Sequence, residues 1–245
     1  MNPISRAHFL KTLLFGALSL PGSACADKVL DKLRGDRVGW ARLKTPSAHW
    51  KRHATGDPVL MQFLQRQTSL NLDPKWQVAD VERLDEMQLY PLLFSQGVHM
   101  VQSATGRSNV AEYVRRGGFL LIDACCNPNI NGMSHDDFFG REREFLGAVL
   151  PEARVVALPA EHFVYRCFFQ FPEGRPPHTY FNNVYDARKA RFGLYGITNQ
   201  SRGAGILSLS GLQCGWDRMI APAGHDVLCM QMLVNIYIYA MTQGA

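Results

Sequence analysis

Residues that could carry out thiol, acid–base or metal chemistry gather in one short stretch, GGFLLIDACCNPNINGMSHDD, at residues 117–137. An apolar run ends there on Asp123, the thiols of Cys125 and Cys126 follow, and His135 comes soon after. A thiolate beside a histidine is a nucleophile, and cysteine with histidine also binds zinc. The stretch marks a candidate site and leaves its chemistry open.

Four interpretations of the cysteine pair can be weighed. As a nucleophile, Cys125 needs a base such as His99 or His135, or a helix N-terminus, to lower its thiol pKa. A metal site would combine both cysteines with His135 and Asp136, but adjacent cysteines cannot easily direct both sulfurs at one ion, so no metal and no cofactor are predicted. A disulfide between Cys125 and Cys126 would be strained. The fourth interpretation is a buried structural thiol.

Ligands of open parallel sheets bind at the carboxyl ends of strands, where Asp123 lies. This favours Asp123 as a ligand-binding residue, although a carboxylate there can also cap the next loop. Residues 134–137 equally fit a helix start with Ser134 as N-cap, and Trp216 equally fits a core residue. The candidate ligand-binding residues are Asp123, Cys126, Asp136, His162, Trp216 and Asp217.

The composition is that of a globular protein. Of 245 residues, 47% are hydrophobic and 19% charged, which excludes a disordered chain. No basic run indicates nucleic-acid binding, and Lys51–His53 is predicted to be a solvated loop. After residues 1–26 five cysteines remain, an odd number that favours one disulfide or none.

Residues 1–26 have the order of an export signal: a basic start, the apolar TLLFGALSL, and small residues ending in Ala24-Cys25-Ala26. SRAHFLK resembles the twin-arginine motif with alanine at the second arginine. Removal of this segment, which holds two basic residues and no acid, changes the net charge from +5 to +3. We therefore expect a periplasmic or otherwise exported protein, or one anchored by an uncleaved N-terminal segment.

Residues 27–245 are predicted to be one α/β domain, because strand patterns alternate with helix patterns. Strands are expected at 38–44, 76–81, 90–95, 119–124, 154–160 and 204–210, with loops and a short strand or two over 174–199. Helices are expected at 57–70 with Asp57 as N-cap, 108–118, 135–149 and 225–243. The last is predicted to be a core helix and not a membrane span, with Asn235 bonded to backbone.

Five segments in this order, WARLKTP, YVRRGGFLLIDAC, LPAEHFVYRCF, GILSLSGLQCGW and VNIYIYAMT, resemble the family called domain of unknown function 4159 (DUF4159). That family resembles the class I glutamine amidotransferase-like and trehalose-utilisation-like proteins. The resemblance implies a three-layer, flavodoxin-like and mostly parallel sheet with helices on both faces.

In glutamine amidotransferases the strand equivalent to GFLLI leads into a turn that bears a nucleophilic cysteine. Here Asp123 stands at that turn, Cys125 follows two residues later, and Ala124 and Cys126 replace glycines. A glutaminase triad is therefore not transferred, although His99 lies in a loop where the family tends to carry a histidine.

We expect a non-catalytic or degenerate domain of the bacterial envelope that binds a small ligand or a protein partner. The alternative is an amidotransferase-like or hydrolytic enzyme with Cys125 as nucleophile and His99 or His135 as base.

Overall fold

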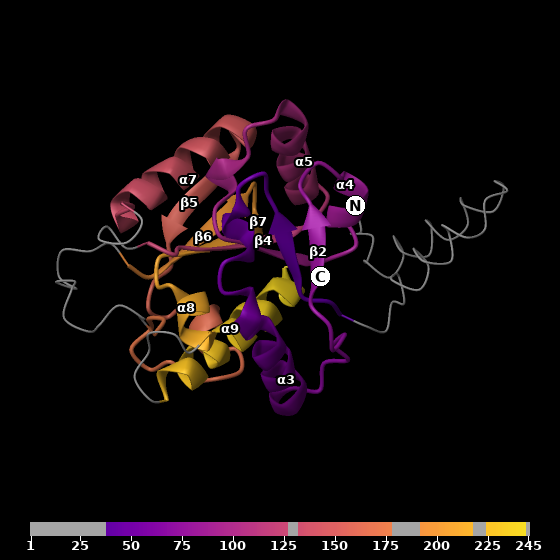
Figure 1. The fold of residues 1–245 in the computed structure, drawn as a ribbon. Helices are drawn as coiled ribbons and strands as arrows, with labels where there is room; N and C mark the ends of the chain where they lie inside the picture. The colour runs from indigo at the N-terminus through magenta and orange to yellow at the C-terminus, as the bar shows by residue number, and fades with distance from the viewer. Residues whose placement is uncertain (1–37, 127–131, 178–191, 218–223, 244–245) are drawn as a thin grey trace, which may run out of the picture.

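The computed structural model describes residues 38–126, 132–177, 192–217 and 224–243, so the predicted signal at 1–26 lies outside the described residues. These residues form a seven-stranded sheet in the order β2-β1-β3-β4-β7-β6-β5. Five neighbouring strands, β2, β1, β3, β4 and β7, are parallel to one another. The strand β6 is antiparallel to both of its neighbours, β7 and β5. Figure 1 shows α5 and α7 on one side of the sheet and α3 and α9 on the other. The predicted α/β fold with a mostly parallel sheet is confirmed.

The strands are β1 (Ala41–Lys44), β2 (Gln77–Asp80), β3 (Leu92–Ser95), β4 (Phe119–Asp123), β5 (Ala153–Ala157), β6 (Leu194–Asn199) and β7 (Arg202–Ser208). The α-helices are α3 (Asp57–Gln67), α4 (Leu84–Met87), α5 (Ala104–Arg115), α7 (His135–Val149), α8 (Leu212–Trp216) and α9 (His225–Thr242). Single turns of 3-10 helix are η1 (Ala48–Lys51), η2 (Ala54–Gly56), η3 (Val98–Met100) and η4 (Phe163–Tyr165).

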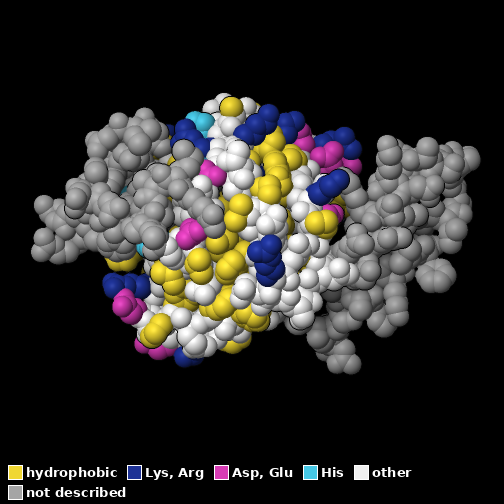
Figure 2. All heavy atoms as spheres, turned by 60° about the horizontal axis from the view of Figure 1, so that its bottom comes forward, with side chains coloured by type: hydrophobic (Ala, Val, Ile, Leu, Met, Phe, Trp, Pro, Cys, Tyr) yellow, Lys and Arg dark blue, Asp and Glu magenta, His cyan; other side chains and the backbone are white. Residues whose placement is uncertain are grey.

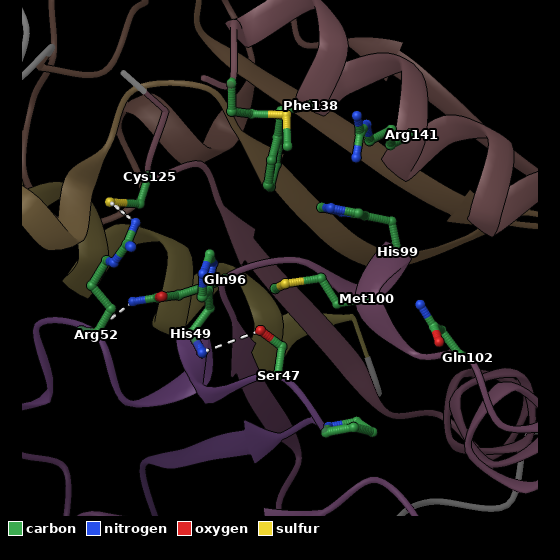
Figure 3. Close-up of a pocket in the computed structure, with 12 residues that line it drawn as sticks. Ser47, His49, Arg52, Gln96, His99, Met100, Gln102, Cys125, Phe138 and Arg141 are labelled. Carbon is green, nitrogen blue, oxygen red and sulfur yellow. Dashed lines mark hydrogen bonds between the residues drawn. The ribbon is translucent and has the colours of Figure 1, made fainter. Parts of the chain in front are cut away.

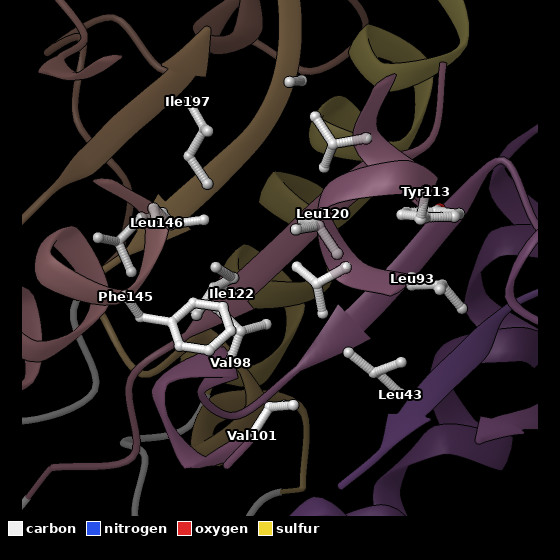
Figure 4. Close-up of a cluster of buried hydrophobic side chains, with 14 of the residues drawn as sticks. Leu43, Leu93, Val98, Val101, Tyr113, Leu120, Ile122, Phe145, Leu146 and Ile197 are labelled. Atoms are coloured by element: carbon white, nitrogen blue, oxygen red, sulfur yellow. The ribbon is translucent and has the colours of Figure 1, made fainter. Parts of the chain in front are cut away.

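The strand β4 is buried on both faces, which explains why its sequence is apolar without alternation. Leu120 and Ile122 face the cluster packed under α5 and α7, part of which Figure 4 shows. Phe119 and Leu121 belong to the cluster under α3 and α9. A strand covered on both faces must be apolar at every position, as the run FLLI is.

Helix starts follow the sequence at α7 and depart from it at α3. The Ser134 hydroxyl caps α7 by accepting from the Asp137 N–H at 3.0 Å, as predicted. The predicted N-cap of α3 is wrong: Gly56 is the N-cap and Asp57 is the first helical residue. The Asp57 carboxylate is instead paired with Arg42.

The strands β6 and β5 reverse the direction of the sheet. Only Gln200 and Ser201 separate β6 from β7, so the two strands pair as an antiparallel hairpin, and Gln200 has a positive φ of 56° in the turn. The strand predicted at 154–160 is β5, which pairs with β6 at the edge of the sheet and leaves Val156 exposed.

The helix α9 is a core helix, as predicted. The Asn235 amide donates to the carbonyls of Val164 and Phe169, both at 2.8 Å, and its oxygen accepts from the Phe169 N–H. Figure 2 shows hydrophobic side chains spread across this end of the molecule, and Val227 and Leu228 of α9 are among the exposed ones. Among the described helices none has the length and apolarity to cross a membrane.

A buried ion pair joins β1 to the start of α3. The guanidinium of Arg42 donates to both carboxylate oxygens of Asp57, at 2.6 and 2.7 Å, and neither side chain is exposed to solvent. Its third nitrogen donates to the carbonyls of Trp50 and Arg52 at 3.0 and 2.9 Å. The pair therefore fixes the chain between β1 and α3.

Removal of one partner should leave an uncompensated buried charge. We expect Asp57→Ala to lower the free energy of unfolding by about 3–5 kcal/mol, measured by urea denaturation. Asp85→Ala is the control, since it breaks the exposed pair of Arg83 and Asp85 and should cost less than about 1 kcal/mol. Equal losses in the two variants would contradict the prediction.

Candidate functional site

Two cysteines and a histidine meet beyond the carboxyl ends of β1, β4 and β7. The Sγ of Cys125 lies 3.8 Å from the Sγ of Cys214. The Nε2 of His53 lies 3.5 Å from the Cys125 sulfur and 3.6 Å from the Cys214 sulfur. Three potential ligand or reactive atoms therefore form a nearly equilateral triangle.

The orientation of the His53 ring is set by Asp217, which follows α8. Its carboxylate lies 2.8 Å from His53 Nδ1 and also accepts from the Thr55 hydroxyl at 2.9 Å. Because Nδ1 faces the carboxylate, Nε2 is directed at the two sulfurs. His53 has φ 57° and ψ 19°, the left-handed region that few residues other than glycine adopt.

The electrostatics of the site favour a thiolate at Cys125. A hydrogen bond from the Cys214 thiol, together with His53 and Arg52, lowers the Cys125 pKa to about 4 against the opposing effect of burial. The Arg52 guanidinium lies 3.7 Å from its sulfur. Burial acts to lower the His53 pKa, but hydrogen bonds to Cys125 and Asp217 outweigh it, so that pKa is raised.

The loop that carries Arg52 and His53 is held by buried polar contacts. The Arg52 carbonyl accepts from Arg42 at 2.9 Å and from the Gln96 amide at 2.5 Å. Gln96 is also hydrogen-bonded to the side chain of Gln213, next to Cys214. Side chains that follow β1, β3 and β7 are thereby connected to one another beneath the site.

A cavity of about 530 Å³ opens beside Cys125. Its wall comes from the segments that follow β1, β3 and β4 and from α7, as Figure 3 shows. The order β2-β1-β3 reverses between β1 and β3, which is where ligands bind in open sheets of this kind. The lining residues are Pro46, Ser47, His49, Arg52, Gln96, His99, Met100, Gln102, Cys125, Met133, Phe138 and Arg141.

Within the described part of the chain, His53, Cys125 and Cys214 are the group whose geometry suits a metal ion, because their ligand atoms lie within 4.8 Å of one another. The five described cysteines form no disulfide with one another. The site thus offers two sulfurs and one imidazole nitrogen.

The histidines predicted from the sequence to act on Cys125 lie elsewhere. His99 is held by the buried carboxylate of Glu142 through its Nδ1 and lines the cavity apart from Cys125. His135 is buried at the start of α7, and burial lowers its pKa. The structure brings His53 to Cys125 instead of either.

Asp123 and Cys126, which lie on either side of Cys125 in the sequence, are both buried. Asp123 accepts from the Gln213 N–H at 2.9 Å, and burial raises its pKa to about 7. It therefore caps the start of α8, far along the chain, and not the loop that follows β4. Cys126 lies in the cluster under α5 and α7, and burial raises its thiol pKa.

The remaining predicted ligand-binding residues do not lie together in the structure. Asp136 is exposed in the first turn of α7. The ring of His162 accepts from the Val164 N–H and caps η4. Trp216 is wholly buried against Trp40. Asp217 is the one member of this set that contacts the triangle, through His53.

Sequence reasoning missed His53 and Arg52, because KRH was interpreted as a solvated loop. A signal was present: the loop follows a parallel strand, as do Cys125 and Cys214, and such strand ends meet at one edge of a sheet. What the sequence could not supply was the strand order that places β1 near β4 and β7.

The buried carboxyl of Asp123 should make stability depend on pH. Its folded pKa of about 7 exceeds the unfolded value of about 3.9, so the folded state retains the proton and loses stability as pH rises from about 4 to 7. The loss is at most about 4 kcal/mol.

Asp123→Asn keeps an oxygen for the Gln213 N–H without a charge. We expect this variant to match the wild type in unfolding free energy only at about pH 3.5, where both states of the wild type are protonated, and to exceed it at pH 8, in urea denaturation with a chelator present. Parallel curves for the two proteins across this range would contradict the prediction.

A comparison with curated proteins finds no match. The model of the family described as Domain of unknown function (DUF4159) matches residues 40–241, which run from just before β1 into the last turn of α9. The chain therefore belongs to the DUF4159 family.

Proposed function

We propose that this protein is a zinc-dependent hydrolytic enzyme whose metal is held by His53, Cys125 and Cys214. The observation that carries the proposal is the triangle of distances among the three ligand atoms. This differs from the sequence-based prediction of no metal, which considered Cys125 with Cys126 and His135.

The distances fit a tetrahedral ion. With Zn–S near 2.3 Å and Zn–N near 2.05 Å, tetrahedral angles put two sulfurs about 3.8 Å apart and a sulfur and nitrogen about 3.6 Å apart. The measured separations are 3.8 Å between the sulfurs and 3.5 and 3.6 Å from His53 Nε2. No side chain would need to move to accept the metal.

The surroundings of the ligands also suit zinc. Asp217 holds the far nitrogen of His53, an arrangement that orients a ligating imidazole and raises its basicity. Two thiolates and one imidazole favour zinc over magnesium or calcium, which prefer oxygen ligands. Two thiolates also balance the charge of a divalent ion.

Three protein ligands leave a fourth position, as in catalytic zinc sites. Zinc would lower the pKa of a water there to about 7 and supply a nucleophile at neutral pH. Cys125 forms part of the cavity wall, so the three ligands lie at one side of the cavity in which a substrate would bind. Hydrolysis of a polar bond is the reaction that these parts support.

A cysteine nucleophile is the second candidate, favoured by the chain of contacts from Asp217 to His53 to Cys125. In that mechanism Cys125 attacks the substrate and His53 carries the proton, while Cys214 supplies only a hydrogen bond to the Cys125 sulfur, which a serine hydroxyl can also donate. In the zinc mechanism Cys214 is a ligand and is required. The two candidates therefore differ most sharply at Cys214.

We also propose that the fold is three-layered and flavodoxin-like and that the protein is exported. The order β2-β1-β3-β4-β7 supports the first, since it is the flavodoxin order 2-1-3-4-5, and it agrees with a resemblance to amidotransferase-like proteins. Residues 1–26 support the second. A non-catalytic role in binding a small ligand or an envelope protein stays a prediction.

Zinc content provides the first test. We expect full-length protein, purified with a phosphine reductant to prevent disulfide formation, to retain about one zinc per chain by mass spectrometry. Cys214→Ser and His53→Ala should lose it. Asp217→Asn should weaken zinc affinity about 10- to 100-fold, because it removes the carboxylate partner of His53.

The matched control for these variants is Cys126→Ala, which changes the thiol next to Cys125 but lies in the core. It should retain zinc even if it lowers stability. A folded wild-type protein that is metal-free and does not take up added zinc would end the proposal.

Mechanism is tested with p-nitrophenyl acetate as a generic ester. The zinc mechanism predicts that Cys214→Ser and chelation each abolish hydrolysis and that no acetyl group accumulates on Cys125. An acetylated Cys125 in the mass spectrum, with activity retained in Cys214→Ser, would establish the cysteine nucleophile instead.

A further inference from the structure

The cavity beside Cys125 is lined by cationic and neutral side chains. Four lining residues can carry positive charge, namely His49, Arg52, His99 and Arg141, and none of the described residues that line it is acidic. We propose that the substrate carries an anionic group, a carboxylate or a phosphate, which Arg141 binds. This deepens the proposed function, because hydrolysis at the metal is assumed for the other end of the substrate.

The positive charge of Arg141 is available to a ligand. It lies exposed on the second turn of α7, and within the residues that the structure describes it forms no ion pair. Asp137, one turn earlier on the helix, interacts with Arg141 only through its charge, and its carboxylate accepts from the Ser134 hydroxyl at 2.7 Å. A guanidinium in this setting can make the bidentate contact that carboxylate and phosphate oxygens prefer.

Glu142, the acid that follows Arg141 in the sequence, is paired with His99 and leaves the charge of Arg141 uncompensated. Glu142 is fully buried behind the cavity wall and accepts from the N–H groups of Val98 and His99 and from His99 Nδ1. The loop approaches Glu142 closely because Gly97, with φ 143°, allows it: a Cβ there would lie 2.9 Å from the carboxylate. His99 is thereby held in place in the cavity wall.

The two ends of the cavity differ in chemistry. Figure 3 shows Cys125 and Arg52 at one side and His99 and Arg141 at the other. Met100, Met133 and Phe138 supply apolar wall, and a volume of about 530 Å³ suits a small molecule. The substrate inferred from this arrangement is a small molecule with a scissile bond at the Cys125 side and an anion at the Arg141 side.

Two anions test the proposal in the full-length protein. Inorganic phosphate and succinate are titrated by calorimetry at constant ionic strength, with and without bound zinc. We expect at least one to bind, and Arg141→Gln to weaken that binding about tenfold or more, the usual effect of removing a charged hydrogen-bond donor. Whichever anion binds more tightly identifies the group as phosphate or carboxylate.

Arg143→Gln is the matched control, since Arg143 is exposed on the same helix and does not line the cavity. It should leave anion binding unchanged. Failure of both anions to bind the wild type, or equal binding by Arg141→Gln, would overturn the proposal. Anion binding to metal-free protein is measured separately from zinc content, so failure of the zinc proposal would be recognised on its own.

Discussion

The buried pair of Arg42 and Asp57 is the interaction on which the candidate site depends most. Two charges without solvent exposure are costly to desolvate and repay the cost only with complete hydrogen bonding. Arg42 meets this condition by using its remaining nitrogen on the carbonyls of Trp50 and Arg52. The requirement to satisfy a buried guanidinium thereby fixes the backbone that precedes His53.

The same constraint ties the site to the topology of the sheet. Arg42 is on β1, beside β3, and Gln96 after β3 holds the same Arg52 carbonyl that Arg42 holds. Gln96 reaches Gln213, whose N–H is capped by Asp123 at the end of β4. Four strand ends are joined by buried polar contacts, so the positions of Cys125, Cys214 and His53 are correlated and not set one by one.

Much of the fold could be predicted from the sequence, because local patterns determine it. The apolar run of β4, the Ser134 cap and the Asn235 amide in a core helix each have a local or generic physical cause. The strand pair β5 and β6 was less predictable, since direction depends on a two-residue turn at Gln200 in a region of weak pattern.

The candidate site was predicted in part. The sequence indicates Cys125 and Asp217, but it favours His135 and His99 as the histidine beside the thiol, and the structure has His53 there. The contact between Cys125 and His53 spans 72 residues. It depends on strand order and on a buried ion pair, and neither leaves a local pattern in the sequence.

The conformation of His53 supports a role for this residue beyond packing. A left-handed backbone at a residue other than glycine is unfavourable and persists where the surroundings over-determine it, often at functional sites. Here the preceding carbonyl is held by Arg42 and Gln96, and the ring is held by Asp217. A histidine needed only to fill space could relax into a commoner conformation. A histidine whose Nε2 must lie at ligand distance from two sulfurs cannot relax in this way, because a different backbone conformation would turn the ring away from Cys125 and Cys214.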